Sequence, residues 1–362
     1  MTLKKVIVVN ATALAAGGAL TILKQFIEAV PEDGYEYLVF APGSVDLQVK
    51  NLNLKIVKTG VTTYAERFLW DLYGLHNQLK KRHITPAATI SLQNTGFRVG
   101  TRCPRFIYYH QPIPLYPYRW NPLKSGERIL WFYKTIYPFF VRLFMNRETE
   151  VFVQLDFLKK AFATRFRIPG DRIHVVFPRI ETTGTSECSG VVIDDRSLNL
   201  FYPAASYIYK NHSLLVRALS SVTDSNLSVT LYLTVSKDAL SIPEMSPNIK
   251  VVFLGPLERE EVQWLYMKVD ALLFPSYIET LGLPLIEAAA AGLPILVSDL
   301  PYAHEVLTDY FGAEYIDYKD HTKWTDAILR LQATKGTRFA AYQTVRRNSW
   351  EEFFRVIESR LQ

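Results

Sequence analysis

Two glutamates eight positions apart, Glu279 and Glu287, lie in the stretch of the chain with the clearest capacity for chemistry. Between them is Gly282, which lets the backbone approach a bound group closely. A helix start is predicted directly after it, where unpaired N–H groups and the helix dipole favour an anion such as phosphate. The two carboxylates can accept hydrogen bonds from sugar or ribose hydroxyl groups beside that phosphate. From these residues alone, two solvated acids near a helix N-terminus are an equally good interpretation.

The segments around these residues predict how they are positioned. Residues 271–274 have the pattern of a short apolar strand, and a helix that opens at Pro284 ends at Gly292. Residues 294–297 then have the pattern of the next buried strand. In such a strand–loop–helix–strand unit, the loop with the glutamates lies at the carboxyl end of a strand. Open parallel sheets bind their ligands there.

The same stretch resembles a known signature. Residues 276–296, SYIETLGLPLIEAAAAGLPIL, are similar to the carboxylate signature of family 4 of the retaining nucleotide-sugar glycosyltransferases, which have the GT-B fold. The likeness continues upstream over residues 252–266, VFLGPLEREEVQWLY. In that family the residue matching Glu279 binds the donor sugar, and the one matching Glu287 binds the nucleotide ribose. The resemblance therefore implies a site for a nucleotide-diphosphate sugar.

The sequence departs from the commoner family pattern inside this loop. Thr280 and Leu281 stand where that pattern has Gly and Phe, whereas Gly282 and the following proline remain. We expect the loop, including Thr280, Leu281, Gly282 and Leu283, to bind the donor. The departure bears on which sugar is transferred.

Lys210 is the predicted partner of the donor diphosphate. It lies where the loop after the predicted strand 198–202 becomes a helix, so its ammonium group can contact phosphate oxygens. Asn211 or Ser213 is expected to cap that helix. Without the resemblance, Lys210 is an ordinary surface lysine. The family often adds an arginine five positions earlier, where this chain has Ala205, so stabilisation of the leaving group rests more on Lys210.

His110 directly follows the predicted strand 105–109, in the proline-rich segment YYHQPIPLYPY. At the carboxyl end of a strand a histidine can reach a cleft. On the residues alone, a histidine that orders its own loop is the simpler interpretation. In several members of the family a histidine after the corresponding strand faces the donor sugar, and we therefore include His110 among the catalytic candidates.

Two glycine-bearing loops complete the predicted donor site. Gly17 and Gly18 end the loop NATALAAGG after the first strand. They either let a bound diphosphate or acceptor come close to the backbone, or they only form the turn. The pattern G-x-G-x-x-G is absent, so dinucleotide binding is weakly supported. Residues 253–257 resemble the loop that cups the nucleobase in the family, which adds Gly255 and Leu257 to the donor site.

Repeated alternation of strands and helices over 362 residues predicts an α/β protein with parallel sheets. We expect a Rossmann-like acceptor domain at residues 1–179, a linker rich in Thr, Ser and Gly at 180–196, and a Rossmann-like nucleotide-sugar domain at 197–345. In the GT-B fold that the resemblance implies, the two domains face each other across a cleft. The amphipathic segment 346–362 would then be a helix that crosses back to the first domain.

Charge and composition exclude several other classes of protein. The net charge of +6 is unevenly distributed along the chain. Residues 1–179 contain 25 Lys and Arg against 12 Asp and Glu, a net charge of +13, whereas residues 180–362 have a net charge of −7. This division indicates an anionic partner for the first half. Cys103 and Cys188 have neither metal-ligand spacing nor a disulfide pattern. No nucleic-acid-binding module, signal peptide or spanning apolar run is recognisable, so we expect a cytoplasmic or membrane-peripheral protein.

Residues 127–147 interleave aromatic residues with Arg128, Lys134 and Arg142, and Pro138 is expected to kink or split the helix there. Aromatic rings and cations suit the interface of an anionic membrane. An ordinary core helix whose cations extend to the surface is an equally good interpretation.

Taken together, the residues and the resemblance predict a retaining glycosyltransferase, in particular a hexosyltransferase. We expect it to need no cofactor beyond its nucleotide-sugar donor. Since no carboxylate is assignable as a nucleophile, we expect front-face substitution, with Lys210 and the amides near Gly282 and Leu283 stabilising the departing diphosphate. No D-x-D triad is present to hold a metal ion, so metal independence is expected. By family analogy the acceptor is a lipid-diphosphate-linked glycan in the assembly of bacterial O-antigen or capsule. A sugar-nucleotide epimerase and a non-catalytic binding subunit are the alternatives.

Overall fold

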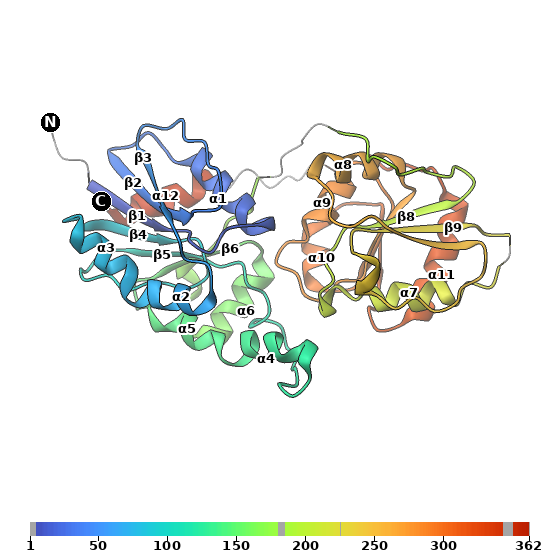
Figure 1. The fold of residues 1–362 in the computed structure, drawn as a ribbon, viewed down its shortest axis with the longest axis horizontal. Coiled ribbons are helices and arrows are strands. Elements are labelled where there is room, and N and C mark those ends of the chain that lie inside the picture. Colours follow the sequence, from blue (N-terminus) through green and yellow to red (C-terminus); the bar gives the residue numbers. More distant parts are fainter. Residues whose placement is uncertain (1–4, 180–184, 225, 343–349, 362) are drawn as a thin grey trace. The chain divides into compact units, whose positions relative to one another are not determined.

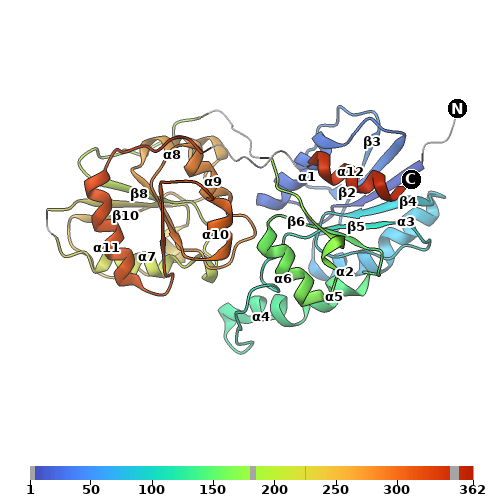
Figure 2. The ribbon, with the colours of Figure 1, turned by 180° about the vertical axis from the view of Figure 1, so that it is seen from behind.

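The computed structural model describes residues 5–179, 185–224, 226–342 and 350–361. The chain forms two compact units (Figures 1 and 2). The first unit consists of Met1–Arg179 together with Arg346–Gln362, and the second of Ile180–Val345. Each unit is an α/β structure built on one parallel sheet, as the alternating pattern predicts.

The first unit is built on a seven-stranded parallel sheet in the order β3-β2-β1-β4-β5-β6-β7. Its strands are β1 Lys5–Asn10, β2 Tyr35–Pro42, β3 Leu54–Thr59, β4 Pro86–Ser91, β5 Arg105–Tyr108, β6 Glu150–Val153 and β7 Ile173–Val175. The chain runs outward from β1 in one direction and from β4 in the other. The sheet therefore has a topological switch point between β1 and β4, where ligands of such sheets bind.

Helices cover this sheet and connect its strands. They are α1 Gly17–Ala29, α2 Tyr64–Leu69, α3 Leu75–Lys81, α4 Arg128–Thr135, α5 Tyr137–Leu143 and α6 Asp156–Phe166. The helical segment over residues 64–81 contains one π-helical turn, Trp70–Gly74, between α2 and α3. The helix α2 begins with a capping box, in which Glu66 N–H donates to Thr63 Oγ1 and Thr63 N–H donates to the Glu66 carboxylate. Pro138 has the expected effect, because α4 ends just before it and α5 starts anew.

The last helix, α12 Trp350–Leu361, belongs to the first unit, and the predicted crossing-back of the C-terminal helix is confirmed. In both ribbon views it lies beside α1 (Figures 1 and 2). Its apolar side packs Trp350 and Phe353 into the same core cluster as Phe26 of α1 and Phe152 of β6. The core of the first unit is therefore completed by a segment about 170 residues further along the chain.

The second unit is built on a six-stranded parallel sheet in the order β10-β9-β8-β11-β12-β13. Its strands are β8 Leu198–Tyr202, β9 Val229–Leu233, β10 Ile249–Phe253, β11 Ala271–Phe274, β12 Ile295–Ser298 and β13 Ala313–Ile316. Its helices are α7 His212–Ser220, α8 Arg259–Lys268, α9 Leu283–Ala290, α10 Pro301–Val306 and α11 His321–Leu331. The predicted strand–loop–helix–strand unit is present as β11, α9 and β12, and α9 begins one residue before Pro284.

Short 3₁₀ turns occupy Ser125–Glu127, Gly170–Arg172, Ile208–Lys210, Lys237–Ala239 and Gln332–Thr334. Of the expected linker, residues 180–184 lie outside the described residues, and 185–196 form neither helix nor strand. Cys188 in that segment is buried. Residues 343–349, where the expected second domain ends and the terminal helix begins, are also outside the described part. Within the described ranges, no helix combines the length and the apolar character that crossing a bilayer requires.

Candidate functional site

The loop between β11 and α9 in the second unit has the backbone geometry that its glycine predicts. Gly282 has a φ of +71°, in the left-handed region, and an added Cβ would lie 3.2 Å from Leu285 Cδ1. Both features favour glycine. The helix α9 starts at the next residue, and Gly282 has no side chain to cap it. The first N–H groups of α9 are thus available to an anion.

The structure brings Lys210 and Glu279 together. Lys210 Nζ lies 2.5 Å from Glu279 Oε1, and the two side chains are mostly buried, with 18% and 10% of their surface exposed. Lys210 ends the loop after β8, and Glu279 lies in the loop after β11. Because β8 and β11 are paired neighbours in the sheet, their two loops meet at its carboxyl edge. The structure therefore places both predicted residues in one charged pair.

The residue after Lys210 has a different role from the expected one. Asn211 was predicted, with Ser213 as the alternative, to cap α7, but no side-chain cap is present at this helix start. Asn211 has a φ of +59°, and its amide donates to the carbonyl oxygen of Tyr318 at 2.9 Å. The side chain thus connects the Lys210 loop to the segment after β13, and the capping prediction is wrong.

Glu287 lies on α9 in a separate polar environment. Its carboxylate accepts a hydrogen bond from Tyr266 Oη at 3.3 Å and lies 3.6 Å from Arg259 Nη2, both on α8. Burial raises the pKa of Glu287, while the Arg259 guanidinium opposes that rise. The two glutamates therefore have different neighbours, Lys210 for Glu279 and α8 for Glu287.

Of the remaining predicted donor residues, Thr280 and Leu281 lie in the loop between β11 and α9, whereas Gly255 and Leu257 lie in the loop between β10 and α8. Leu281 is buried, and Thr280 is half-buried. Gly255 precedes α8 with a φ of +70°, and no atom lies within 4 Å of where its Cβ would be. Leu257, also in the loop between β10 and α8, is half-buried. The geometry keeps Gly255 accessible to a ligand.

In the first unit, Gly17 and Gly18 open α1 at the carboxyl end of β1. Gly17 has a φ of +56°, and neither glycine has an atom within 4 Å of an added Cβ. The two residues thus have open space around the backbone, as a ligand-binding loop needs.

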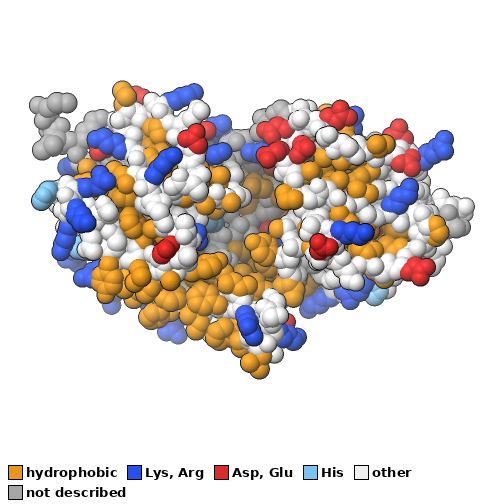
Figure 3. Space-filling model, viewed as in Figure 1, with side chains coloured by type: hydrophobic (Ala, Val, Ile, Leu, Met, Phe, Trp, Pro, Cys, Tyr) orange, Lys and Arg blue, Asp and Glu red, His pale blue; other side chains and the backbone are white. Residues whose placement is uncertain are grey.

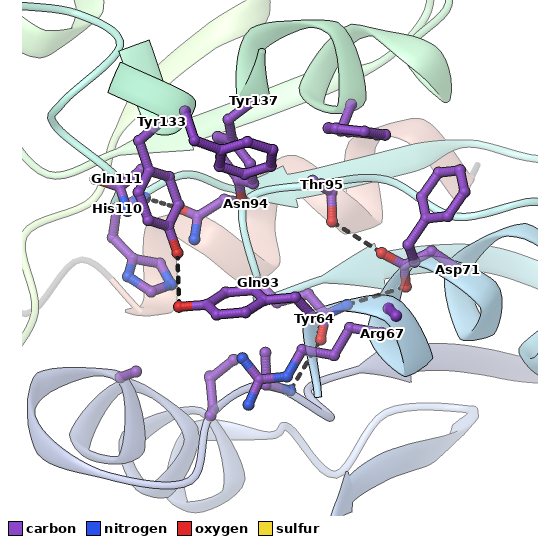
Figure 4. Close-up of a pocket in the computed structure, with 17 residues that line it drawn as sticks. Tyr64, Arg67, Asp71, Gln93, Asn94, Thr95, His110, Gln111, Tyr133 and Tyr137 are labelled. Atoms are coloured by element: carbon purple, nitrogen blue, oxygen red, sulfur yellow. Dashed lines mark hydrogen bonds between the residues drawn. The ribbon is translucent and has the colours of Figure 1, made fainter. Parts of the chain in front are cut away.

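A cavity of about 410 Å³ lies at the carboxyl ends of β1, β4 and β5 in the first unit (Figure 4). It lies next to the topological switch point of the sheet. Its lining consists of Ala13, Leu14, Ala19, Tyr64, Ala65, Arg67, Phe68, Asp71, Gln93, Asn94, Thr95, His110, Gln111, Phe132, Tyr133, Tyr137 and Phe140. The sequence predicted only one of these residues, His110, as a site residue.

His110 is fixed in one orientation at the cavity wall. Its backbone N–H donates to Asn94 Oδ1 at 2.6 Å, and its ring Nε2 lies 3.0 Å from the carbonyl oxygen of Leu92. Since a carbonyl only accepts, Nε2 carries the proton in this contact. Burial lowers the pKa of His110, which favours the neutral ring. A neutral imidazole with Nδ1 unprotonated can accept a hydrogen bond from a ligand hydroxyl group.

Residues 191–347 match the family model described as glycosyl transferases group 1. The solved structures similar to this chain include WaaG, a glycosyltransferase involved in lipopolysaccharide biosynthesis, with a TM-score of 0.59 at 16% identity over 98% of this chain and 95% of that one. Anabaena HepE in complex with UDP-glucose has a TM-score of 0.59 at 12% identity over 98% and 99% of the two chains. The chain has the GT-B fold.

Among curated relatives, the chain is similar to the O-antigen chain mannosyltransferase RfbU of Salmonella typhimurium strain LT2. The two are 29% identical over 205 residues, which is 55% of each chain. The chain spans about half the length of the curated relatives it matches. The group 1 match covers the Lys210 and Glu279 loops together with both glutamates of the signature.

Sequence reasoning missed Asp71, a deeply buried charged group at the wall of the first-unit cavity. It lies in the π-helical turn after α2 and is only 6% exposed. Its carboxylate accepts hydrogen bonds from Asn10 at 2.8 Å, Gln93 at 3.0 Å and Thr95 at 3.0 Å. Burial raises the pKa of Asp71 to about 7. A single aspartate inside a helical pattern gives no local signal for such a site.

Arg259 was also missed, although it lies within the upstream segment that resembles the family. Its proximity to Glu287 depends on the packing of α8 against α9. Within the described residues, no group of three or more His, Cys, Asp or Glu side chains is arranged to hold a metal ion. Cys103 and Cys188 are both buried free thiols.

Two of the cations in the segment 127–147 make hydrogen bonds within the first unit. Lys134 Nζ donates to the carbonyl oxygens of Tyr116 and, at 3.1 Å, Pro114. Arg142 donates to the carbonyl oxygen of Phe166. The alternative interpretation had these cations extending to the surface from a core helix. Arg142 is exposed, whereas Lys134 is half-buried and bound to carbonyl groups.

Proposed function

We propose that this protein is a retaining glycosyltransferase, in particular a hexosyltransferase, that moves a sugar from a nucleotide-diphosphate sugar to a glycan acceptor. The observation that supports it best is the Lys210–Glu279 pair beside the Gly282 start of α9, within the residues that match the group 1 family model. HepE, which shares the fold, is described with bound UDP-glucose. This is consistent with a nucleotide-sugar donor.

The second unit has the groups that departure of a nucleoside diphosphate requires. One of the three N–H groups of the Lys210 ammonium donates to Glu279. The other two can donate to phosphate oxygens. The N–H groups at the start of α9 add a second stabilising element. We propose that these groups lower the barrier to front-face substitution by stabilising the leaving diphosphate without a metal ion. Glu279 then also accepts a hydrogen bond from the donor sugar.

The separate environments of the two glutamates predict separable defects. Replacing Glu287 by alanine should weaken binding of the nucleoside diphosphate itself, because this carboxylate contacts the ribose in the proposed complex. Replacing Glu279 by glutamine should spare that binding and reduce turnover, since it contacts the sugar. The measurement is the thermal shift of each purified variant with UDP, GDP and ADP, because a ligand of the folded state raises the melting temperature. Glu244→Gln, a change in an exposed loop of the same unit, is the control.

Equal loss of diphosphate affinity in both variants would overturn this division of roles. Turnover is followed as release of nucleoside diphosphate from the nucleotide sugar, with and without acceptor. Formation of an epimerised nucleotide sugar from the donor alone would instead identify the epimerase alternative. Absence of any donor turnover by a protein that binds nucleoside diphosphates would identify a non-catalytic binding subunit.

The proposed acceptor is a lipid-diphosphate-linked glycan of bacterial O-antigen or capsule assembly. The relative RfbU is an O-antigen chain mannosyltransferase, and the structural neighbour WaaG is involved in lipopolysaccharide biosynthesis. The first unit of this chain adds its own observation, since its residues 1–179 have a balance of +13. A diphosphate-bearing acceptor suits this charge.

We also propose that the first unit associates peripherally with an anionic membrane on the cytoplasmic side. Hydrophobic side chains gather over the part of this unit formed by α2, α4 and α5 (Figure 3). The large exposed residues there are Tyr64, Phe68, Leu69, Tyr73, Ile129, Ile136, Phe139 and Leu143. Exposed aromatic and aliphatic residues on a basic domain are the composition of an interfacial surface.

Vesicle sedimentation tests this membrane face. The wild type should sediment with anionic vesicles at low salt and be released as salt rises, because electrostatic attraction falls off within a Debye length of about 8 Å at physiological ionic strength. Phe139→Ser with Leu143→Ser should weaken sedimentation and leave nucleotide affinity unchanged. Lys134→Glu with Arg142→Glu should instead lower the melting temperature, because both cations bind backbone carbonyls. If the wild type does not sediment at low salt, the membrane proposal is wrong.

A further inference from the structure

The cavity of the first unit is polar at two ends and aromatic between them (Figure 4). Asp71 and Thr95 lie at one end, and His110 and Gln111 lie at the other. Between the ends, Tyr64 of α2 and Tyr133 of α4 meet through their hydroxyl groups at 3.2 Å. The other large rings on the wall are Phe68, Phe132, Tyr137 and Phe140. The cavity thus combines flat apolar surfaces with hydrogen-bonding groups at its edges.

The Asp71 carboxylate is arranged to accept one more hydrogen bond. Two of its three donors, Asn10 and Gln93, reach Oδ1, whereas in the described part of the chain Oδ2 accepts only from Thr95. A carboxylate has about four acceptor positions. No Lys or Arg within the described residues forms an ion pair with Asp71, and burial raises its pKa to about 7. A buried carboxyl group without a counter-charge at a cavity wall is typical of a ligand site.

We infer that this cavity binds one pyranose ring of the acceptor glycan, with Asp71 accepting a hydrogen bond from a ring hydroxyl group and the aromatic side chains covering the CH faces. The inference rests on the proposed function, because it assigns the ligand to the acceptor. A pyranose has hydroxyl groups around its edge and apolar faces, and it matches the two kinds of lining. His110, whose neutral ring can accept from a hydroxyl group, borders the other end.

An apolar chain is the competing occupant, because most of the wall is apolar and exposed hydrophobic residues continue outside it. Such a chain would make no hydrogen bond with Asp71, and covering a polar group with hydrocarbon without a hydrogen bond costs free energy. The acid that is positioned by Asn10, Gln93 and Thr95 would then form no hydrogen bond with the ligand. The polar cluster therefore favours the sugar.

The substitution Asp71→Asn separates the two occupants with little change in shape. The amide oxygen of this variant can still accept from Asn10 and Gln93, and its NH₂ group can donate to Thr95 Oγ1. The variant should therefore fold, but it presents a donor where Asp71 offers an acceptor. Asp46→Asn, at an exposed carboxylate of the same unit away from the cavity, is the matched control. Tyr133→Ala removes one ring of the wall.

Saturation-transfer NMR with methyl glycosides of neutral hexoses and N-acetylhexosamines measures the binding directly in the full chain. At least one should bind the wild type and lose about 10-fold or more in affinity in D71N, because the variant presents a donor to the ring hydroxyl group where Asp71 presents an acceptor. Tyr133→Ala should also weaken it, and the control should not. Binding of none of these glycosides, or equal binding by D71N, would overturn the inference. Decyl phosphate binding that D71N leaves unchanged would identify an apolar-chain site.

The readouts distinguish failure of this inference from failure of the proposed function. Thermal shifts with nucleoside diphosphates should be the same in D71N and the wild type, because Lys210 and Glu287, proposed to bind the diphosphate and the ribose, lie in the second unit. Asp71-dependent glycoside binding without any donor turnover would reject the transferase and keep the sugar site. Donor turnover with an acceptor KM that D71N does not change would reject the sugar site and keep the transferase.

Discussion

Replacing Lys210 by alanine should lower the rate of sugar transfer by about 10²–10³-fold, the effect of removing one preorganised donor from a developing negative charge. Lys210 is held 2.5 Å from Glu279 beside the start of α9, so its ammonium group is already oriented before a donor binds. The arginine that the family often has upstream is replaced here by Ala205. We therefore expect a larger share of leaving-group stabilisation to rest on this one lysine.

The control for Lys210→Ala is the double change Lys210→Met with Glu279→Gln. The single variant leaves the buried Glu279 carboxylate without its nearest cation, which by itself destabilises a protein. The double variant removes both charges and should recover thermal stability, whereas transfer should stay low. The wild type should also keep its activity in EDTA. Strong activation of a metal-stripped sample by Mg²⁺ or Mn²⁺ would show that an ion, rather than Lys210, neutralises the diphosphate.

Replacing Phe353 by alanine should cost the first unit about 3–5 kcal/mol of its free energy of unfolding, the usual loss for a buried phenylalanine. Phe353 is fully buried, and its ring centroid lies 4.3 Å from that of Phe152 and 5.3 Å from that of Trp350. Phe26 of α1 packs against it edge-to-face at 6.0 Å. The substitution therefore removes the centre of an aromatic cluster that joins α12 to the sheet.

The measurement is urea unfolding followed through tryptophan fluorescence, with Glu351→Ala as the control. Glu351 is exposed on the same helix, and such surface changes usually stay within about 0.5 kcal/mol. The nucleotide affinity of Phe353→Ala below its unfolding transition should match the wild type, because Lys210 and Glu287, the proposed ligands of the diphosphate and the ribose, lie in the second unit. A loss of less than about 1 kcal/mol would mean that α12 is not part of the core in solution.

Local patterns in the sequence are sufficient for the order of the elements and for the backbone of the proposed donor loop. Short apolar runs predict the strands, and Gly282, Pro284 and Gly292 mark the loop, start and end of α9. These signals act over a few residues, because backbone conformation and helix termini depend on near neighbours. Because such signals are local, they predicted Asn211 or Ser213 as the cap of α7. The Asn211 amide donates instead to a carbonyl more than 100 residues away, and this contact depends on the tertiary structure.

The contacts within each candidate site depend on which strands are neighbours in the folded sheet. Lys210 and Glu279 are 69 positions apart and meet because β8 pairs with β11. Asp71 gains Asn10, 61 positions before it, because the turn after α2 packs against the end of β1. Lys134 turns inward because carbonyl groups of the proline-rich loop lie within its reach. The sequence alone therefore determined the order of the elements and the candidate loop residues, whereas only sheet order and helix packing decided which distant side chains lie together.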